Sequence, residues 1–443
     1  AWVGTDQSVE AVQVTEWSEP QTVIGSHLHR IVYPDFYEKH QQKSKQLATG
    51  HRHRSGKVSC LQLRGEYLFA AAGEKGMIVY DVAGIANKGI SQRIITAPSS
   101  KRGHNTTIDS ENATCLSLIT TQPIAPERNQ GELMRVINEE KPFHPIYNYA
   151  VITDSVEGII LTDIGTLADG EPRNNFLTRA LTWNEGGVLD GARDIAVGGR
   201  YAYIIAEAGL VVLNLDDPLN PQHLATVPLV SGRAVVQQFR YLFVTDSEGL
   251  KTIDITNPEK PRLVLDSKLA LANAKKVFLA RTYAYVAAGS DGLIIADIED
   301  PENIRLYKQF NAGIVDAQDV VVASTNASLY AYVADGVDGL KVIQLTSPDS
   351  QPRYYGFSPE PMPELIASFP MKGRALGLSR GLERDRAVDE TGGQVALFNR
   401  IGSGPLSESD MRGLYLDKKG KPWFVEDDPT QKLTAETQRA EIE

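Results

Sequence analysis

Apolar and polar residues alternate along most of the chain, in short runs separated by turn residues. One pattern recurs: two aromatic residues flanking a small or apolar one, then apolar residues, an acidic turn, a glycine and an alternating apolar run that usually ends in Asp or Asn. The clearest copies start at Tyr201, Tyr241, Tyr283 and Tyr330. Period-two alternation rich in β-branched and aromatic residues is typical of strands, and Gly or Asp turns between such runs are typical of hairpins. The pattern therefore predicts an all-β fold.

The spacing of these copies indicates a repeat architecture. Their marker glycines, Gly209, Gly249, Gly292 and Gly339, follow one another at intervals of about 40 to 47 residues, which fits the four-stranded blade of a β-propeller. A HEAT-like helical pair has a similar period, but helices so rich in Tyr, Val, Gly and Pro are not expected. Within a blade we expect antiparallel strands such as 193–197, 201–206, 210–215 and 223–227.

Weaker copies extend the array in both directions. Units start near Tyr67 and Tyr147, and 374–378 and 394–398 look like parts of a further unit. The first residues align with strands two to four of a blade, and the inner strand of that blade is missing before Ala1. The count favours eight blades and leaves seven open. The strand-like segments 413–416 and 422–425 are candidates for closing the ring.

These observations predict one domain rather than several. We expect a single propeller over 1–427 and a polar tail over 428–443. Its parts are a partial blade at 1–26, a histidine-rich basic loop at 27–57, blades at about 58–400 and closing strands at 401–427.

The third strands of the units, such as Gly292-Leu-Ile-Ile-Ala-Asp297, resemble those of the LVIVD-repeat family of β-propellers over most of residues 1–400. Gln344 departs from the terminal Asp of that pattern. The resemblance implies an exported or cell-surface bacterial or archaeal protein, in some cases associated with or fused to multihaem c-type cytochromes. Haem in a partner or in an upstream region is the cofactor it implies. It assigns no catalytic residue.

Composition excludes some classes of partner and cofactor. There are 45 Lys and Arg residues against 56 Asp and Glu, for a formal net charge of −11. This charge argues against a protein that coats nucleic acid or binds an anionic membrane surface. No apolar run is long enough to span a membrane. Without a CxxCH motif, no haem is expected to be bound covalently by this segment. The two cysteines, Cys60 and Cys115, cannot form a disulfide framework, and whether they form one bridge stays open.

A repeated small residue followed by a cation, at or just before the inner strands, is the first candidate site. The candidate ligand-binding residues are Lys57, Arg193, Arg233, Lys275 and Arg374, with Gln318 in the same register. If the inner strands surround a central channel, these side chains converge at its mouth and suit an anionic ligand or the carboxylates of a partner. The ordinary alternative is that each cation pairs with an acid such as Asp194 or Asp319, or with a hairpin aspartate of the next blade.

Histidines in the 27–57 loop are the second candidate site. The metal or haem-ligand candidates are His27, His29, His51 and His53. A His-x-His pair in an extended segment puts both imidazoles on one side, where they can hold zinc or copper or offer an axial ligand to a neighbouring haem. The alternative is a basic surface loop that docks onto an acidic partner. The identity of any metal stays open.

Other motifs carry no catalytic signal. The hairpin aspartates Asp154, Asp246, Asp291, Asp335 and Asp338 lack the spacing of a calcium loop and are explained by turn chemistry. There is no GxSxG, P-loop or HExxH sequence, so no catalytic residue is assigned. The sequence therefore favours a non-catalytic interaction or assembly propeller in an exported complex, with a cytochrome of extracellular or periplasmic electron transfer as the candidate partner. The alternative is an enzyme or an anion binder at the cationic mouth.

Overall fold

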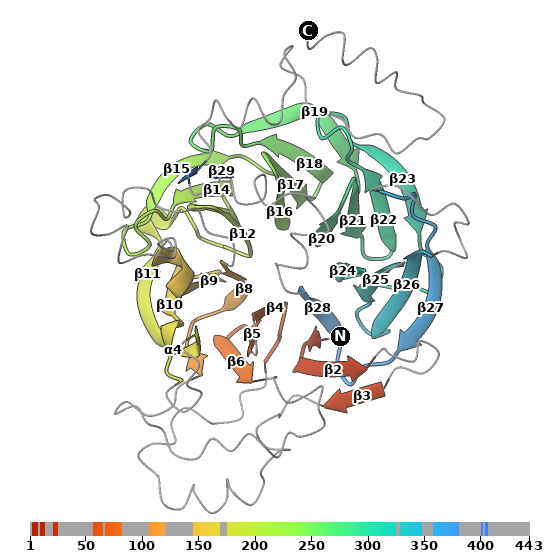
Figure 1. Ribbon diagram of the computed structural model, residues 1–443, viewed down its shortest axis with the longest axis horizontal. Helices are drawn as coiled ribbons and strands as arrows, with labels where there is room; N and C mark the ends of the chain where they lie inside the picture. The colour runs from red at the N-terminus through yellow and green to blue at the C-terminus, as the bar shows by residue number, and fades with distance from the viewer. Residues whose placement is uncertain are drawn as a thin grey trace, which may run out of the picture.

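The computed structural model shows an all-β fold of four-stranded antiparallel blades arranged radially around a central axis (Figure 1). It describes residues 2–7, 9–13, 21–24, 56–64, 67–81, 106–119, 145–168, 175–324, 328–347, 358–380, 400–401 and 404–405. The β-propeller architecture that the sequence predicts is confirmed.

Within these residues the strands form seven blades, numbered here from the N-terminus, with the inner strand of each given first. Blade 1 is β28 (Ala375–Arg380), β1 (Trp2–Thr5), β2 (Val9–Gln13) and β3 (Gln21–Ile24). Blade 2 is β4 (Cys60–Arg64), β5 (Tyr67–Ala71), β6 (Met77–Asp81) and β7 (Thr107–Ile108). Blade 3 is β8 (Ala113–Leu118), β9 (Tyr149–Asp154), β10 (Gly158–Asp163) and β11 (Thr178–Trp183). Blade 4 is β12 (Asp194–Gly198), β13 (Tyr201–Ala206), β14 (Gly209–Asn214) and β15 (Gln222–Val227).

The remaining three blades follow the same order along the chain. Blade 5 is β16 (Ala234–Gln238), β17 (Tyr241–Asp246), β18 (Gly249–Asp254) and β19 (Arg262–Ala270). Blade 6 is β20 (Val277–Ala280), β21 (Tyr283–Ala287), β22 (Leu293–Asp297) and β23 (Arg305–Phe310). Blade 7 is β24 (Asp319–Ser324), β25 (Leu329–Ala334), β26 (Leu340–Thr346) and β27 (Glu364–Phe369). Outside the blades lie η5 (Pro145–Asn148), α4 (Gly165–Ala168), η7 (Glu185–Gly187) and the pair β29 (Arg400–Ile401) and β30 (Gly404–Pro405).

The hydrophobic core lies between neighbouring blades. The second and third strands are buried on both faces, because each face packs against an adjoining blade, and the outer strand β15 is largely exposed. Tyr203 of blade 4 packs with Val235 and Val244 of blade 5, and Tyr285 of blade 6 packs with Val320 of blade 7. The second aromatic of these two repeat units is therefore a packing residue between blades. Burial raises the pKa of both tyrosines, which stay neutral.

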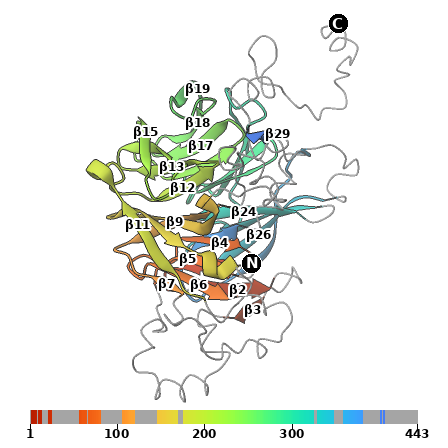
Figure 2. The same ribbon diagram turned by 60° about the vertical axis from the view of Figure 1, so that its left-hand side comes forward.

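The ring is closed by a strand from the far end of the chain. β28 pairs with β1 in antiparallel fashion, with Val3 opposite Leu378, and with β4 in parallel fashion, with Ser379 opposite Leu61. Figures 1 and 2 both place β2 and β3 beside the sheet of β4 to β6. The predicted absence of an inner strand before Ala1 is consistent with this pairing, since β28 supplies that strand.

The closing strand and the blade count differ from what the sequence favoured. Residues 374–378 were expected to belong to a separate last unit, and closure was expected from 401–427. Instead, β28 closes the ring, and this explains why the described residues hold seven blades where the sequence favoured eight. Of the expected closing segment the structure describes 401 and 404–405 alone, so 413–416 and 422–425 lie outside the described residues.

Glycines permit this closure. A Cβ on Gly4 would lie 2.6 Å from the Val58 carbonyl oxygen, and one on Gly377 would lie 2.8 Å from the Ser59 carbonyl oxygen. Both distances are too short for a real side chain, so only glycine allows β1 and β28 to approach the chain entering blade 2. Within the described part of the chain, no helix is long and apolar enough to cross a membrane.

Candidate functional site

Backbone hydrogen bonds define the register of the predicted cationic positions. The N–H groups of Arg193, Arg233, Lys275 and Gln318 each donate to a carbonyl of the second strand of the same blade, at 2.7 to 2.9 Å. These four residues therefore hold one equivalent position at the start of their inner strands, as the sequence predicts.

Lys57 and Arg374 do not share that position. In blade 2 the equivalent N–H belongs to Ser59, which donates to Ala71, so Lys57 lies two residues earlier. At the entry to blade 1, the N–H of Ala375 donates to the Gly336 carbonyl. At the entry to blade 7, the N–H of Ala317 donates to the Gly289 carbonyl in the same way. Leu376 therefore matches Gln318, and Arg374 also lies two residues earlier. An irregularity between Gly4 and Thr5 in the β1–β28 pairing accompanies this offset in blade 1.

Three of the cations, Arg233, Lys275 and Arg374, reach from one blade to another. The Lys275 ammonium lies 2.6 Å from Asp316 Oδ1, and an Arg374 guanidinium nitrogen lies 3.0 Å from Asp316 Oδ2. Arg233 donates to the carbonyls of Ala272 and Ala274, in the connection that leads into blade 6. Arg193 donates through Nε to Gly191. Pairing between blades, the ordinary alternative, is thus confirmed for Lys275 and Arg374, with Asp316 as the acid.

Asp316 is ionised at neutral pH. Partial burial opposes ionisation, but hydrogen bonds from Lys275 and Gln318 and the nearby Arg374 charge hold the pKa of this carboxyl below its usual value. Asp316 therefore binds cations from two inner-strand entries and links blade 7 to its neighbours on both sides.

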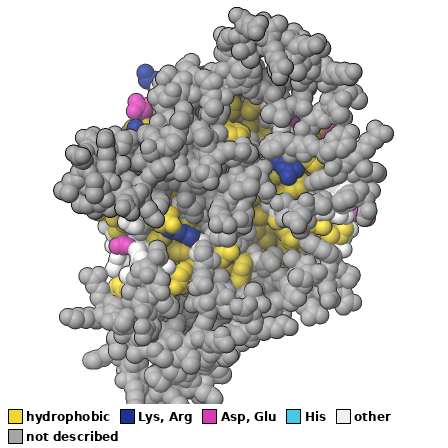
Figure 3. Space-filling model, in the orientation of Figure 1, with side chains coloured by type: hydrophobic (Ala, Val, Ile, Leu, Met, Phe, Trp, Pro, Cys, Tyr) yellow, Lys and Arg dark blue, Asp and Glu magenta, His cyan; other side chains and the backbone are white. Residues whose placement is uncertain are grey.

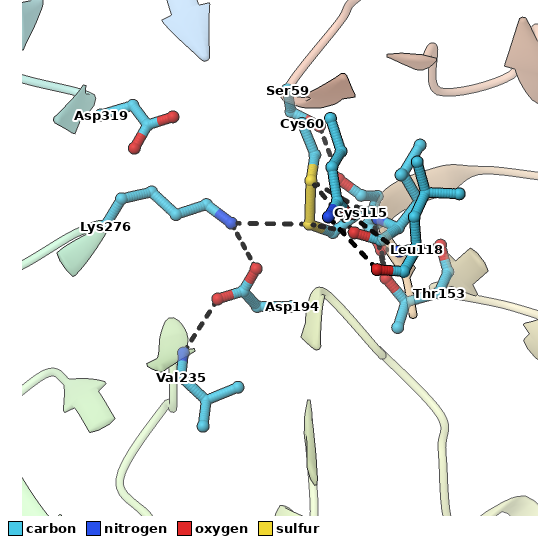
Figure 4. Close-up of a disulfide and its surroundings, with 12 residues drawn as sticks. Ser59, Cys60, Cys115, Leu118, Thr153, Asp194, Val235, Lys276 and Asp319 are labelled. Carbon is cyan, nitrogen blue, oxygen red and sulfur yellow. Dashed lines mark hydrogen bonds and ion pairs between the residues drawn. A yellow bond between two sulfur atoms is a disulfide. The ribbon is translucent and has the colours of Figure 1, made fainter. Parts of the chain in front are cut away.

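The next residue along each inner strand forms a second set, which we call the inner ring. Its members lie opposite equivalent residues of the second strands, for example Cys60 opposite Ala71 and Asp194 opposite Ile205. The inner ring consists of Cys60, Cys115, Asp194, Ala234, Lys276, Asp319 and Gly377. Cysteines, acids and one lysine that are far apart in the sequence therefore meet at one level around the axis (Figure 4).

The two acids of the inner ring bind the next blade. Asp194 accepts the N–H of Val235 at 2.8 Å, and Asp319 accepts the N–H of Leu378 at 2.9 Å. Asp194 is fully buried, and its other carboxylate oxygen lies 2.5 Å from the Lys276 ammonium, which neutralises it. The sequence singled out both acids but missed Lys276. The signal that could have found it is its place directly after the Ala274-Lys275 pair.

The open question about the two cysteines is answered by the inner ring. Cys60 and Cys115 form a disulfide that joins the inner strands of blades 2 and 3. The Lys276 ammonium lies 3.9 Å from Cys115 Sγ, and the Leu116 N–H lies 3.4 Å from Cys60 Sγ. The disulfide therefore has a positively charged neighbour on one sulfur and an amide donor on the other.

The hairpin aspartates serve as turn residues, as predicted. Asp154 accepts the N–H groups of Val156 and Glu157 within its own turn, and that of Asn112 from the connection preceding its blade. Asp246 and Asp335 bond in related ways to their own turns or to the preceding connection. Among the described residues, no group of three or more His, Cys, Asp or Glu side chains is arranged to hold a metal ion. His27, His29, His51 and His53 lie outside the described residues, so their role stays a prediction.

These hydrogen bonds define one end of the propeller, which we call the hairpin face. It carries the turns between second and third strands and the connections that lead into the inner strands. Besides the cations, it presents exposed valines: Val156 and Val337 in turns, and Val230 and Val315 in connections, each 53% to 68% exposed. Figure 3 shows a surface view in which described Lys and Arg side chains lie among hydrophobic ones.

The fold and the inner ring define a disulfide-linked β-propeller built of repeats. The LVIVD repeat model matches residues 191–226, 240–267, 272–312 and 316–354, which fall in blades 4 to 7. The LVIVD repeat thus occurs four times across these residues, and the resemblance drawn from the third strands is confirmed for residues 191–354.

Comparisons with other known proteins bear on the fold alone. No curated protein matches the sequence. A crystal structure of a protein from Lactobacillus plantarum aligns over 85% of this chain and 97% of its own, with a TM-score of 0.52 and 11% identity. The WD40 repeats of RRP9 align over 75% and 85%, with a TM-score of 0.46 and 10% identity. The β-propeller domain of Cps50 (Swd1) from Myceliophteria thermophila aligns over 74% and 91%, with a TM-score of 0.44 and 14% identity.

Proposed function

We propose that this protein is a non-catalytic interaction propeller whose hairpin face binds an acidic segment of a partner protein. The observation that carries the proposal is the combination on one face of exposed valines with Arg193, Arg233, Lys275 and Arg374. Apolar side chains supply buried area at an interface, and cations select an acidic partner and orient it. A rigid ring of blades holds both in place.

Site-directed photo-crosslinking in native cells tests this proposal. A photoreactive amino acid at Val156 or Val337 is expected to capture the same acidic protein, whereas one at Leu265 serves as the control. Leu265 is 81% exposed but lies on the outer strand β19, away from the hairpin face. Equal capture from Leu265, or none from either valine, contradicts the proposal.

We further propose an extracytoplasmic setting, with a multihaem c-type cytochrome as the partner. The Cys60–Cys115 disulfide supports the setting, because structural disulfides persist mainly in oxidising compartments. The proposal of a cytochrome partner rests on the resemblance to the LVIVD-repeat family. A visible spectrum of the crosslinked partner tests it: the absence of c-type haem bands removes the cytochrome and leaves docking at the hairpin face intact.

A second function, the binding of a small anion, is favoured by Arg193 and Arg233. Within the described part of the chain neither pairs with a carboxylate, and both bond to backbone carbonyls. Calorimetry with inorganic phosphate tests it. We expect binding that is lost in Arg193→Gln/Arg233→Gln and kept in Arg305→Gln, which lies on the outer strand β23. Equal heats for all three proteins contradict this function.

A further inference from the structure

The disulfide of the inner ring stands in an environment that suits exchange with an external thiol. The two cysteines differ in burial, because Cys115 is 1% exposed while Cys60 is only partly buried. They differ also in charge, because the Lys276 ammonium lies 3.9 Å from Cys115 Sγ. An incoming thiolate is therefore expected to attack Cys60 Sγ. Cys115 Sγ, which lies next to the lysine, is then the leaving group.

Thiol–disulfide exchange depends on the leaving sulfur. A thiolate attacks one sulfur, and the other leaves with the electron pair, so the rate rises when the leaving thiolate is stabilised. A neighbouring lysine stabilises a thiolate by its charge. Lys276 reaches Cys115 from blade 6, and the Leu116 N–H is placed to stabilise a thiolate on Cys60 in turn.

We propose that the Cys60–Cys115 disulfide is a thiol-exchange site, at which an external thiolate attacks Cys60 Sγ and Cys115 leaves as a thiolate held by Lys276. In this step the bond between the two cysteine sulfurs breaks, and a mixed disulfide forms between Cys60 and the attacking thiol. A second external thiolate then attacks the external sulfur of the mixed disulfide. This releases the external disulfide and leaves Cys60 as a thiolate, which takes a proton from water. Two external thiols are oxidised, and one protein disulfide is reduced.

Lys276 connects this chemistry to the contacts between blades. In the disulfide form its ammonium pairs with Asp194, which also accepts the Val235 N–H of blade 5. A thiolate on Cys115 competes with Asp194 for the same ammonium. Reduction therefore alters the ion pair at the entry of blade 4 as well as the covalent link between blades 2 and 3.

The experiment measures reduction of the folded, full-length chain at pH 7. Free thiols are trapped with a maleimide that increases the mass of the protein, after timed exposure to glutathione or to reduced thioredoxin. Faster reduction by glutathione identifies a small-thiol site, and faster reduction by thioredoxin identifies a protein-dithiol site. Both support the exchange site. A disulfide that reacts with neither until a denaturant is added overturns it.

The role of Lys276 is tested in the same assay. Lys276→Met is expected to slow reduction about fivefold, and Lys276→Arg to retain the rate, because the leaving thiolate needs a positive charge. Lys308→Met, on the exposed outer strand β23, is the control and is expected to react at the wild-type rate. Equal rates for wild type and Lys276→Met overturn the role of the lysine.

A second variant guards against misfolding. Lys276→Met leaves Asp194 buried without its cation, so Lys276→Met/Asp194→Asn is measured beside it, and circular dichroism checks both. In the reduced protein, the pH at which thiolate absorbance at 240 nm develops gives a readout that a purely structural role would not move. We expect it at a higher pH in both variants than in the wild type. An unchanged titration overturns the proposal for Lys276.

Discussion

Lys276 and Asp194 form an ion pair across a blade that separates them. Their nitrogen and oxygen lie 2.5 Å apart, although Lys276 directly precedes β20 of blade 6 and Asp194 lies on β12 of blade 4. The inner-ring residue of the intervening blade 5 is Ala234, which has a small side chain without charge. The pair thus links two blades that do not adjoin.

Removal of this cation is expected to destabilise the fold. Lys276→Met should lower the free energy of unfolding by about 3 kcal/mol at pH 7, because Asp194 is left charged and fully buried. Lys276→Met/Asp194→Asn should recover most of that loss, since no buried charge remains. Urea unfolding of the wild type, both single variants and the double variant measures the coupling. A double variant no more stable than Lys276→Met contradicts the explanation.

The disulfide is expected to contribute to stability through the unfolded chain. It closes a loop with a sequence separation of 55 residues, for which the loop-entropy relation gives about 4 kcal/mol. Cys60→Ala/Cys115→Ala should therefore unfold at lower urea concentration than the oxidised wild type. The reduced wild type is the control and should resemble the variant. If the variant matches the oxidised protein instead, the bridge does not stabilise the ring.

Asp316 gives a prediction of pH dependence. Asp316→Asn should cost about 1 kcal/mol at pH 7, because the pairs with Lys275 and Arg374 are lost at a partly exposed site. The pKa of Asp316 is lowered on folding, so its stabilisation is present above the ordinary value of 3.8 and is lost as pH falls through the lowered folded value. Thermal unfolding from pH 7 to pH 2 should show a constant difference down to about pH 4 and convergence below it. A difference that vanishes between pH 7 and pH 5 contradicts the assignment.

Closure of the ring gives a prediction at Gly377. Gly377→Ala should destabilise the protein by about 2 kcal/mol, because the added Cβ would lie 2.8 Å from the Ser59 carbonyl oxygen. Hydrogen exchange should accelerate first in β1, β28 and β4, where the two ends of the chain meet. Gly165→Ala is the control, since its nearest neighbour is a side-chain oxygen of Asp163 at 3.2 Å, which can move aside. Uniform acceleration across all blades would show that closure is not the weak point.

Much of the fold could be predicted because the repeat is local. The alternation around Tyr201 and the glycine at Gly209 predict β13 with its observed bounds and β14 to within one residue, since strand and hairpin depend on neighbouring residues. Burial of Tyr203 and Tyr285 follows from the same period. The match of LVIVD repeats to residues 191–354 agrees with these units.

The candidate site was predictable only in part. Arg193, Arg233 and Lys275 share a register because each follows a similar hairpin, but the equivalence of Arg374 failed at an irregular pairing between strands from opposite ends of the chain. The contacts of Lys276 could not be predicted, because Asp194 and Cys115 are far from it in the sequence. The residues around Lys276 do not indicate that its side chain crosses the ring.

The sequence by itself determined the strands, the repeat period, the blade cores and the turn aspartates, because each depends on residues within one unit or on one repeated face. Only the tertiary structure decided which strand closes the ring, that Cys60 meets Cys115, and that Lys276 meets Asp194 and the disulfide. Those contacts depend on how the blades are placed around the axis. That placement is set by the sum of blade-to-blade packing and by the glycines that let the two chain ends approach, and no local pattern encodes it.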